Sequence, residues 1–163
     1  MSRSRAADVI SKAIAPIGVD YNLFPTYTGM NISGPANWLA FDNKRTCEAL
    51  ATQGYVALQT SPEAITVTLT DKGREVFTNN DAGYAGRQSW KTAACRMELV
   101  SVTGISKTSE NTAVVQYTWK WHLTPVGSIA WKSVPELAGQ DPDATFTTQA
   151  ALQRFDDGWR IAN

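Results

Sequence analysis

The chain has 163 residues, of which 43% are hydrophobic and 18% charged, and its 15 basic residues balance its 15 acidic ones. This composition predicts one folded domain or two small modules that share a core, and it excludes a disordered chain or a coiled coil. No apolar stretch approaches the roughly 20 residues that span a bilayer. The balanced charge creates no net field toward nucleic acid or acidic lipid.

The first six residues are polar and basic, and Asp8 and Lys12 interrupt the apolar run that a secretory signal requires. We therefore expect either a cytosolic protein or the mature part of an exported one. A polar, serine-containing start is typical of the residues that follow the lipid-bearing cysteine of a bacterial lipoprotein.

The only cysteines are Cys47 and Cys95, and neither belongs to a C-x-x-C pair, so redox catalysis and a zinc ribbon are not expected. Two reduced, buried thiols are one interpretation. For an exported protein we expect a disulfide between them, which would leave no free thiol when the unreduced protein is denatured and titrated.

Apolar residues at helical spacing predict a helix over residues 6–17, with Ser2 or Ser4 as its cap. Residues 19–40 are rich in Gly, Pro, Asn and aromatics and fit no period. They are expected to form packed turns or an aromatic-lined ligand loop. The next segment predicts a helix over 44–53 that ends at Gly54, followed by strands over 55–59 and 65–69. A short helix capped by Thr70 is expected over 71–77.

The order helix, glycine, strand, turn, strand, then Leu69-Thr70-Asp71-Lys72-Gly73-Arg74-Glu75, resembles the latter half of a winged-helix domain of the MarR and PadR kinds. The resemblance covers residues 44–77 and implies a winged-helix-like shape. In a regulator of that kind, Lys44, Arg45, Lys72 and Arg74 would contact DNA.

The second half of the chain predicts a sheet. A loop is expected over 79–86 and a connection broken by Pro and Gly over 124–143. The predicted strands are 96–105, 112–123 and 145–155, with a tight turn at Asp157-Gly158 and a last strand at 159–161. The strict alternation of Val115, Tyr117, Trp119, Trp121 and Leu123 predicts one buried sheet face.

The ending Phe155-Asp156-Asp157-Gly158-Trp159-Arg160-Ile161 looks like the C-terminal hairpin of small secreted or lipoprotein α+β domains, including cystatin-like and NTF2-like ones. We expect an α+β fold in which a small helical, winged-helix-like N-terminal half packs on an antiparallel β-sheet. Residues 1–163 are expected to form one structural unit, with a soft boundary near 79–86 between its parts 1–78 and 87–163.

No catalytic motif is present in the sequence, and we expect no enzyme, no cofactor and no metal. His122 is the single histidine and is expected on a solvated strand face. Four aspartates near the end, Asp141, Asp143, Asp156 and Asp157, lie in Pro- and Gly-marked turns, where Asp bonds the backbone.

By elimination, the sequence favours a non-enzymatic protein-binding or accessory protein of the bacterial cell envelope. We expect it in the periplasm or, if it is a lipoprotein whose anchor has been removed from this sequence, attached to the outer membrane. An immunity or inhibitor protein fits this size. Its partner would be another protein, and Trp131, Lys120 and His122 are the candidate contacts. The alternative is a cytoplasmic winged-helix DNA-binding regulator, although the turn Ser61-Pro62-Glu63 lacks the cation that a wing needs to reach phosphate.

Overall fold

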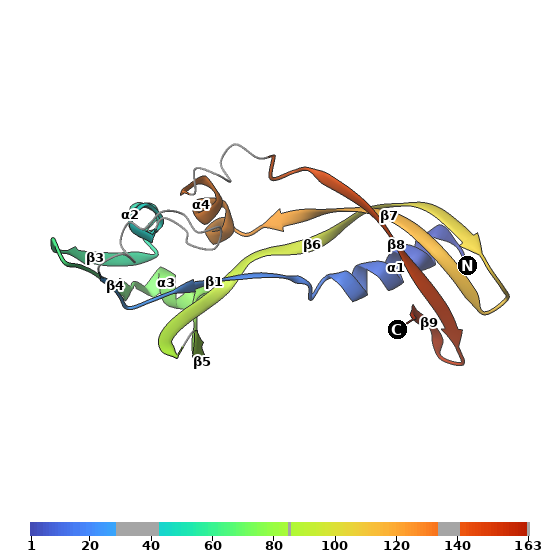
Figure 1. Ribbon diagram of the computed structural model, residues 1–163, viewed down its shortest axis with the longest axis horizontal. Coiled ribbons are helices and arrows are strands. Elements are labelled where there is room, and N and C mark those ends of the chain that lie inside the picture. Colours follow the sequence, from blue (N-terminus) through green and yellow to red (C-terminus); the bar gives the residue numbers. More distant parts are fainter. Residues whose placement is uncertain (29–42, 85, 134–140, 163) are drawn as a thin grey trace. The chain divides into compact units, whose positions relative to one another are not determined.

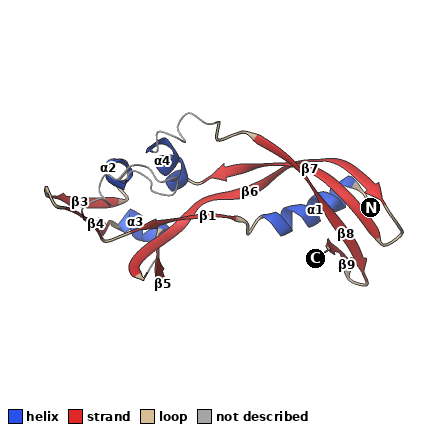
Figure 2. Ribbon diagram, viewed as in Figure 1, coloured by secondary structure: helices blue, strands red, loops and turns tan. Residues whose placement is uncertain are grey.

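A computed structural model describes residues 1–28, 43–84, 86–133 and 141–162 (Figure 1). Helices and strands both occur in these residues, as the predicted α+β class requires (Figure 2). The helices are α1 (Arg3–Ile14), α2 (Asn43–Thr52), α3 (Asp71–Val76) and α4 (Pro125–Ser133). The strands are β1 (Gly18–Leu23), β2 (Thr26–Thr28), β3 (Val56–Thr60), β4 (Ala64–Leu69), β5 (Thr78–Tyr84), β6 (Arg87–Lys107), β7 (Thr112–Leu123), β8 (Thr145–Phe155) and β9 (Gly158–Ile161).

The chain forms two compact units, each assembled from separate segments. Unit 1 consists of Met1–Gly18, Cys95–His122 and Asp141–Asn163, and unit 2 consists of Val19–Ala94 and Leu123–Gln140. The chain passes between the units within β6 and at the end of β7, so the sequence segment 79–86, where we expected a boundary, belongs to unit 2.

Unit 1 is a helix packed on an antiparallel sheet of β6, β7, β8 and β9. Ala6, Ile10 and Ile14 of α1 are four residues apart and buried, so they form the single apolar stripe that the helix needs. They pack with Val115 of β7 and Leu152 of β8, among others. The predicted helix is present but begins and ends three residues earlier than expected, so Ile17 lies outside it and is exposed. The Ser2 hydroxyl caps it by accepting from the N–H of Arg5 at 3.2 Å.

Strand β7 has the residues predicted for it and pairs with β8 from Thr112↔Gln153 to Lys120↔Thr145. Strand β8 then turns into β9, with Phe155 opposite Gly158. The two-residue turn is therefore Asp156-Asp157 rather than the predicted Asp157-Gly158. Gly158 has φ +134°, a backbone conformation that side chains disfavour, and this explains the glycine immediately after the turn.

In unit 2, a second small sheet has the order β2-β4-β3, and α2 packs against β3 and α4. The predicted elements between residues 44 and 77 are confirmed within a residue or two at each end. Gly54 has φ +77° and follows the last turn of α2, as expected of a helix C-cap glycine. The core of this unit includes Leu50, Ile65 and Phe77.

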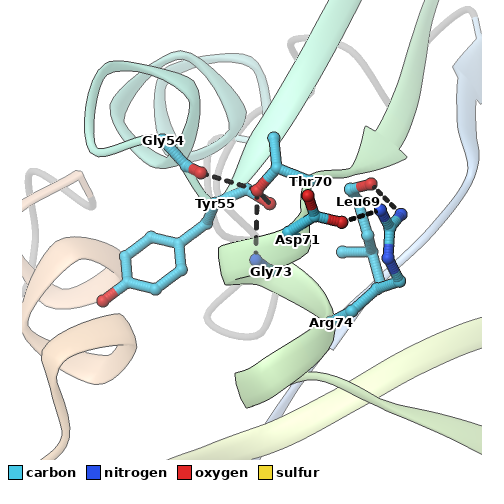
Figure 3. A network of polar contacts seen from close by, with 7 residues as sticks. All are labelled: Gly54, Tyr55, Leu69, Thr70, Asp71, Gly73 and Arg74. Atoms are coloured by element: carbon cyan, nitrogen blue, oxygen red, sulfur yellow. Dashed lines mark hydrogen bonds and ion pairs between the residues drawn. The ribbon is translucent and has the colours of Figure 1, made fainter.

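Thr70 joins the end of β4 to the start of α3 and to the strand beside it (Figure 3). Its backbone N–H donates to the carbonyl of Tyr55 at 3.1 Å, and its hydroxyl donates to the carbonyls of Gly54 and Tyr55 at 2.7 and 3.0 Å. The same hydroxyl accepts from the N–H of Gly73 at 3.1 Å. A Cβ at Gly73 would lie 2.0 Å from the Tyr55 carbonyl oxygen, so this approach requires glycine.

The same junction occurs again where β7 leads into α4. The sequences are Leu69-Thr70-Asp71-Lys72-Gly73 and Leu123-Thr124-Pro125-Val126-Gly127. The Thr124 hydroxyl donates to the carbonyls of Ala93 and Ala94 at 2.7 and 3.2 Å and accepts from the N–H of Gly127 at 3.0 Å. A Cβ at Gly127 would lie 1.8 Å from the Ala94 carbonyl oxygen.

This second junction corrects the prediction of a broken connection over 124–143, because residues 125–133 form α4. Pro125 is the first helical residue, where its fixed φ suits a helix and its missing N–H costs nothing. Gly127 is needed because its backbone closely approaches the carbonyl of Ala94, and not because the chain turns there. Of the predicted connection, residues 134–140 lie outside the described residues.

Two further segments that we expected to be irregular are strands. Residues 79–86 were expected to be a loop, but β5 covers Thr78–Tyr84 and pairs with β6 across a register shift between Asn80 and Tyr84. The Asn80 side-chain amide stabilises this irregularity by donating to the carbonyl of Gly83 at 2.8 Å and to the Ser89 hydroxyl at 3.2 Å.

The other such segment is 19–40, which contains β1 and β2. Tyr21 and Leu23 are buried while Asp20 and Val19 are exposed, so the alternation exists but is only a few residues long. The expected ligand loop falls largely on residues 29–42, which lie outside the described residues.

Replacing Gly73 by alanine is expected to lower the free energy of unfolding by about 3 kcal/mol, because the new methyl group would overlap a backbone oxygen that pairs with Thr70. Helix propensity alone would predict the opposite sign, a gain of up to about 1 kcal/mol. Urea denaturation would measure the change, with Glu75→Ala on the same helix as the control expected within about 0.5 kcal/mol of the original. A stabilised Gly73→Ala protein would contradict the junction.

Candidate functional site

The face of β7 that we expected to be buried is covered over only part of its length. Val115 and Tyr117 are buried, whereas Trp119, Trp121 and Leu123 are only half-buried. A 12-residue helix is about 18 Å long, but a 12-residue strand spans about 40 Å. Helix α1 therefore cannot cover the whole strand, and the prediction of a uniformly buried face was wrong for the tryptophans.

Beyond Tyr117, this face carries an aromatic cluster, formed by Trp119, Trp121 and Phe146, of which Trp119 packs against the core of unit 1. Phe146 is opposite Trp119 in the β7–β8 register, and their rings stack with centroids 4.7 Å apart and an angle of 28°. Trp121 meets Trp119 edge to face at 5.1 Å and 86°. Phe146 is 44% exposed. Aromatic pairs of this geometry are preformed and rigid, and rigid aromatic side chains dominate the energetics of protein interfaces.

Two of the predicted partner contacts lie on the opposite face of β7, because side chains alternate along a strand. Lys120 Nζ is 3.7 Å from Asp143 Oδ1, and His122 Nδ1 is 3.3 Å from Glu98 Oε2. The His122–Glu98 pair is largely exposed, and Lys120 reaches from a half-buried position to an exposed Asp143, so both pairs stabilise the fold little. The structure thus places Lys120 and His122 together on a polar face, apart from the aromatic cluster.

The third predicted contact, Trp131, belongs to α4 in unit 2. It is half-buried, and its indole Nε1 is buried without a hydrogen-bond partner in the part of the chain that the structure describes. Trp131 therefore does not share a unit with Lys120 and His122. Its role as a partner contact stays a prediction.

The four residues predicted for DNA contact are all in unit 2. Lys44 and Arg45 are exposed on α2. Lys72 Nζ donates to the carbonyl of Gln53 at 2.7 Å and lies 4.3 Å from the centre of the Tyr55 ring. Arg74 donates to the carbonyl of Leu69 at 2.7 Å and pairs with Asp71 (Figure 3). Lys72 and Arg74 are therefore used within the unit.

Two hollows border the helices. In unit 1, a cleft of about 460 Å³ lies between α1 and the β8–β9 hairpin. The apolar part of its lining consists of Val9, Trp159 and Ile161. Acidic and basic residues line it as well, including the ion pair of Asp157 with Arg160. In unit 2, a groove of about 590 Å³ between α2 and α4 includes Thr52 and Lys132. Neither lining contains a histidine or a cysteine that could act as a nucleophile or base.

The expected role of the C-terminal aspartates in turns agrees with the geometry. The Asp141 carboxylate accepts from the N–H of Asp143 at 2.9 Å, and Asp156 and Asp157 form the β8–β9 turn. Among the described residues, no three of His, Cys, Asp and Glu are grouped as metal ligands would be. Nor does any helix described there have the length and apolar content needed to cross a membrane.

Cys47 and Cys95 are both buried and are thiols in this structure. Cys47 is in unit 2 and Cys95 in unit 1, and the disulfide between them stays a prediction. Cys47, Tyr21 and Tyr27 are buried in the same core cluster of unit 2, where the Tyr27 hydroxyl accepts from the N–H of Phe24 at 3.0 Å. Burial raises the pKa of Cys47 to about 12 and raises the pKa values of both tyrosines.

Comparison with protein-family models, with curated protein sequences and with solved structures finds no match to this chain. The aromatic cluster was missed by sequence reasoning because strand register decides which side chains meet. The signal available was Phe146, a large apolar residue in a strand otherwise rich in Thr, Gln and Ala.

We expect the reduced protein to lose stability at alkaline pH. The unfolded Cys47 thiol ionises near its ordinary pKa of 9.0, whereas the folded one keeps its proton until about pH 12. Stability is thus complete below pH 9 and falls as the pH rises from 9 toward 12. Between pH 8 and 10, this one group should cost about 1.4 kcal/mol.

Urea denaturation in reducing buffer at both pH values would measure the loss, and Cys47→Ser should lose about 1.4 kcal/mol less than the original protein over the same interval. The substitution also shifts stability at every pH, so only the difference between the two pH values carries the test. Equal losses in both proteins would contradict a buried, protonated Cys47 thiol.

Proposed function

We propose that the protein is a non-enzymatic protein-binding component of the bacterial cell envelope that contacts its partner through the aromatic cluster of unit 1. The observation that carries the proposal is the stack of the exposed Phe146 ring on Trp119, beside the half-buried Trp121, at the margin of the unit 1 core. Stacked aromatics that are half-exposed in the free protein lose further apolar surface to water when a partner covers them.

The rigidity of the cluster supports a role in binding over the alternative that these aromatic side chains are exposed without a function. Trp119 and Phe146 contact each other across paired strands, and Trp121 contacts Trp119 on the same strand, so little side-chain freedom remains to be lost on association. The partner should therefore present an apolar residue at the centre of its contact surface, with polar groups around it. An immunity or inhibitor protein has this requirement, because it works by covering part of another protein.

The envelope assignment has a different basis. It is supported by the resemblance of the last hairpin to small secreted α+β domains. The arrangement of α1 on the antiparallel strands β6 to β9 agrees with a domain of that general kind. We propose a periplasmic or lipid-anchored location on this basis.

The alternative, a winged-helix regulator, has one supporting observation, the order α2, β3, β4, α3 in unit 2. Two features argue against it. Lys72 and Arg74 are engaged by carbonyls of their own unit, and Ala49 and Thr52 of α2, with Gln53 just after it, line the groove shared with α4. A helix that reads DNA needs that side open to the major groove.

The partner can be sought with a photocrosslinking side chain at position 121 in the organism that encodes the chain. The same side chain at position 118, on the opposite face of β7, is the control. We expect one envelope protein to be crosslinked from position 121 and not from position 118.

With that partner purified, Trp121→Ala should weaken binding by about 30-fold, the effect of a central interface residue, while Thr118→Ala should leave it unchanged. Isothermal calorimetry would measure both. Because Trp121 is half-buried, circular dichroism must show that the variant is folded. Equal affinity of the Trp121→Ala protein would reject the aromatic cluster as the binding surface.

We further expect no binding to random duplex DNA at about 10 µM protein and physiological salt, because a domain that contacts six to ten phosphates needs that many clustered cations. Fluorescence anisotropy at low and high salt would test this. Saturable binding with a steep salt dependence, lost when Lys44 and Arg45 are changed to alanine, would favour the regulator instead.

A further inference from the structure

One edge of the unit 1 sheet is open over half of a strand. Strand β8 pairs with β7 along Thr145–Gln153, but β9 pairs with it only from Leu152 to Phe155. In the part of the chain that the structure describes, no strand lies on the other side of residues 145–150. Residues 145–149 are all exposed, in agreement with an uncovered edge.

The direction of the backbone groups along this edge follows from one hydrogen bond. In an antiparallel sheet, the N–H and C=O of a residue point to the same neighbouring strand, and the side alternates from one residue to the next. The carbonyl of Ala151 accepts from the N–H of Ala162 at 2.9 Å, so Ala151 points away from β7. Thr145, Thr147 and Gln149 therefore point the same way and present their backbone groups to the open edge.

Residues 145–150 also lack the features that usually protect an edge strand from pairing with another chain. Natural edge strands carry lysine, proline, a bulge or an inward charge that prevents pairing with another chain. The segment 145–150 has the sequence Thr-Phe-Thr-Thr-Gln-Ala and contains no charged residue and no proline. Its pairing with β7 is regular throughout.

We propose that two copies of this chain associate through this edge, with β8 of one copy antiparallel to β8 of the other. Antiparallel pairing of identical strands is self-complementary about a two-fold axis. Only residues that point outward can form the hydrogen-bonded pairs, and Ala151 is already engaged by Ala162.

The register that uses all three outward residues places Thr147 opposite Thr147 of the partner subunit, and Thr145 opposite Gln149 of the partner subunit. It provides about six backbone hydrogen bonds. No like charges meet across the axis, and a threonine opposite a threonine is a favourable cross-strand pair. This match of the edge with itself favours a second copy over an extended segment of another protein.

Sedimentation equilibrium over a range of about 5 to 500 µM tests the association. The original protein should approach twice the 17.8 kDa of one chain as its concentration rises. Thr147→Pro removes one outward N–H without touching a bond to β7, so it should remain folded and monomeric. Thr147→Val changes the same side chain but keeps the N–H, and it should still dimerise.

Thr148→Pro is the matched control for the direction of the backbone groups. Its N–H points to β7, so this variant should lose stability where Thr147→Pro does not. A monomeric original protein across the whole range, or a dimer that Thr147→Pro leaves intact, would overturn the proposal.

Distances between spin labels test the register without relying on proline. Position 147 lies on the two-fold axis of the proposed dimer. Position 153 lies six residues farther along β8, and its side chain is on the same exposed face of the sheet. Labels on Thr147→Cys should be less than about 20 Å apart in the dimer, and labels on Gln153→Cys about 40 Å apart. The reverse order would mean that the copies meet elsewhere. Loss of Trp121 should not affect these results, so they are independent of the proposed partner site.

Discussion

The contact between a threonine hydroxyl and backbone carbonyls of a neighbouring segment determines where two strands of this protein become helices. At Thr70 and again at Thr124, one hydroxyl caps the helix and donates to that segment, which is the entry to β3 in the first case and β6 in the second. A glycine three residues later lets the helix approach a carbonyl of the same segment. The helix direction is thereby set by the sheet. The packing of α3 on β4, and of α4 on α2, follows from these two junctions.

The elements that the sequence predicted well are those in which local chemistry and packing agree. The α1 stripe of Ala6, Ile10 and Ile14 and the alternation along β7 have enough residues to define a period. Helix α4 was missed because Pro125 and Gly127 were interpreted as breakers. Both residue types are compatible with a helix start, and the repeat of Leu-Thr-x-x-Gly was the available signal. Strand β5 has no such signal, since Asn80 stabilises it by contacts remote in sequence.

The candidate site was less predictable for a geometric reason. Alternation in β7 identifies Trp119 and Trp121 as members of one face, but it gives no information on how far a covering helix extends. Nor does it show that Phe146 will be opposite Trp119, because register depends on the whole β7–β8 pairing. Lys120 and His122 were correctly assigned to the polar face, and the same alternation separates them from the aromatic cluster.

The division of unit 1 into three separate segments has a consequence for the order in which the chain folds during synthesis. Unit 2 ends at residue 140, whereas the strands that bury the α1 stripe include Leu152 and Ile161. Helix α1 emerges from the ribosome first, but its apolar side has no partner until β7 is made, and its contacts are complete only with the last hairpin. An isolated 12-residue helix is marginal in water, so these early residues should stay unstructured until then. Unit 2, with its locally connected α2, β3, β4 and α3, is complete earlier in synthesis and can fold first.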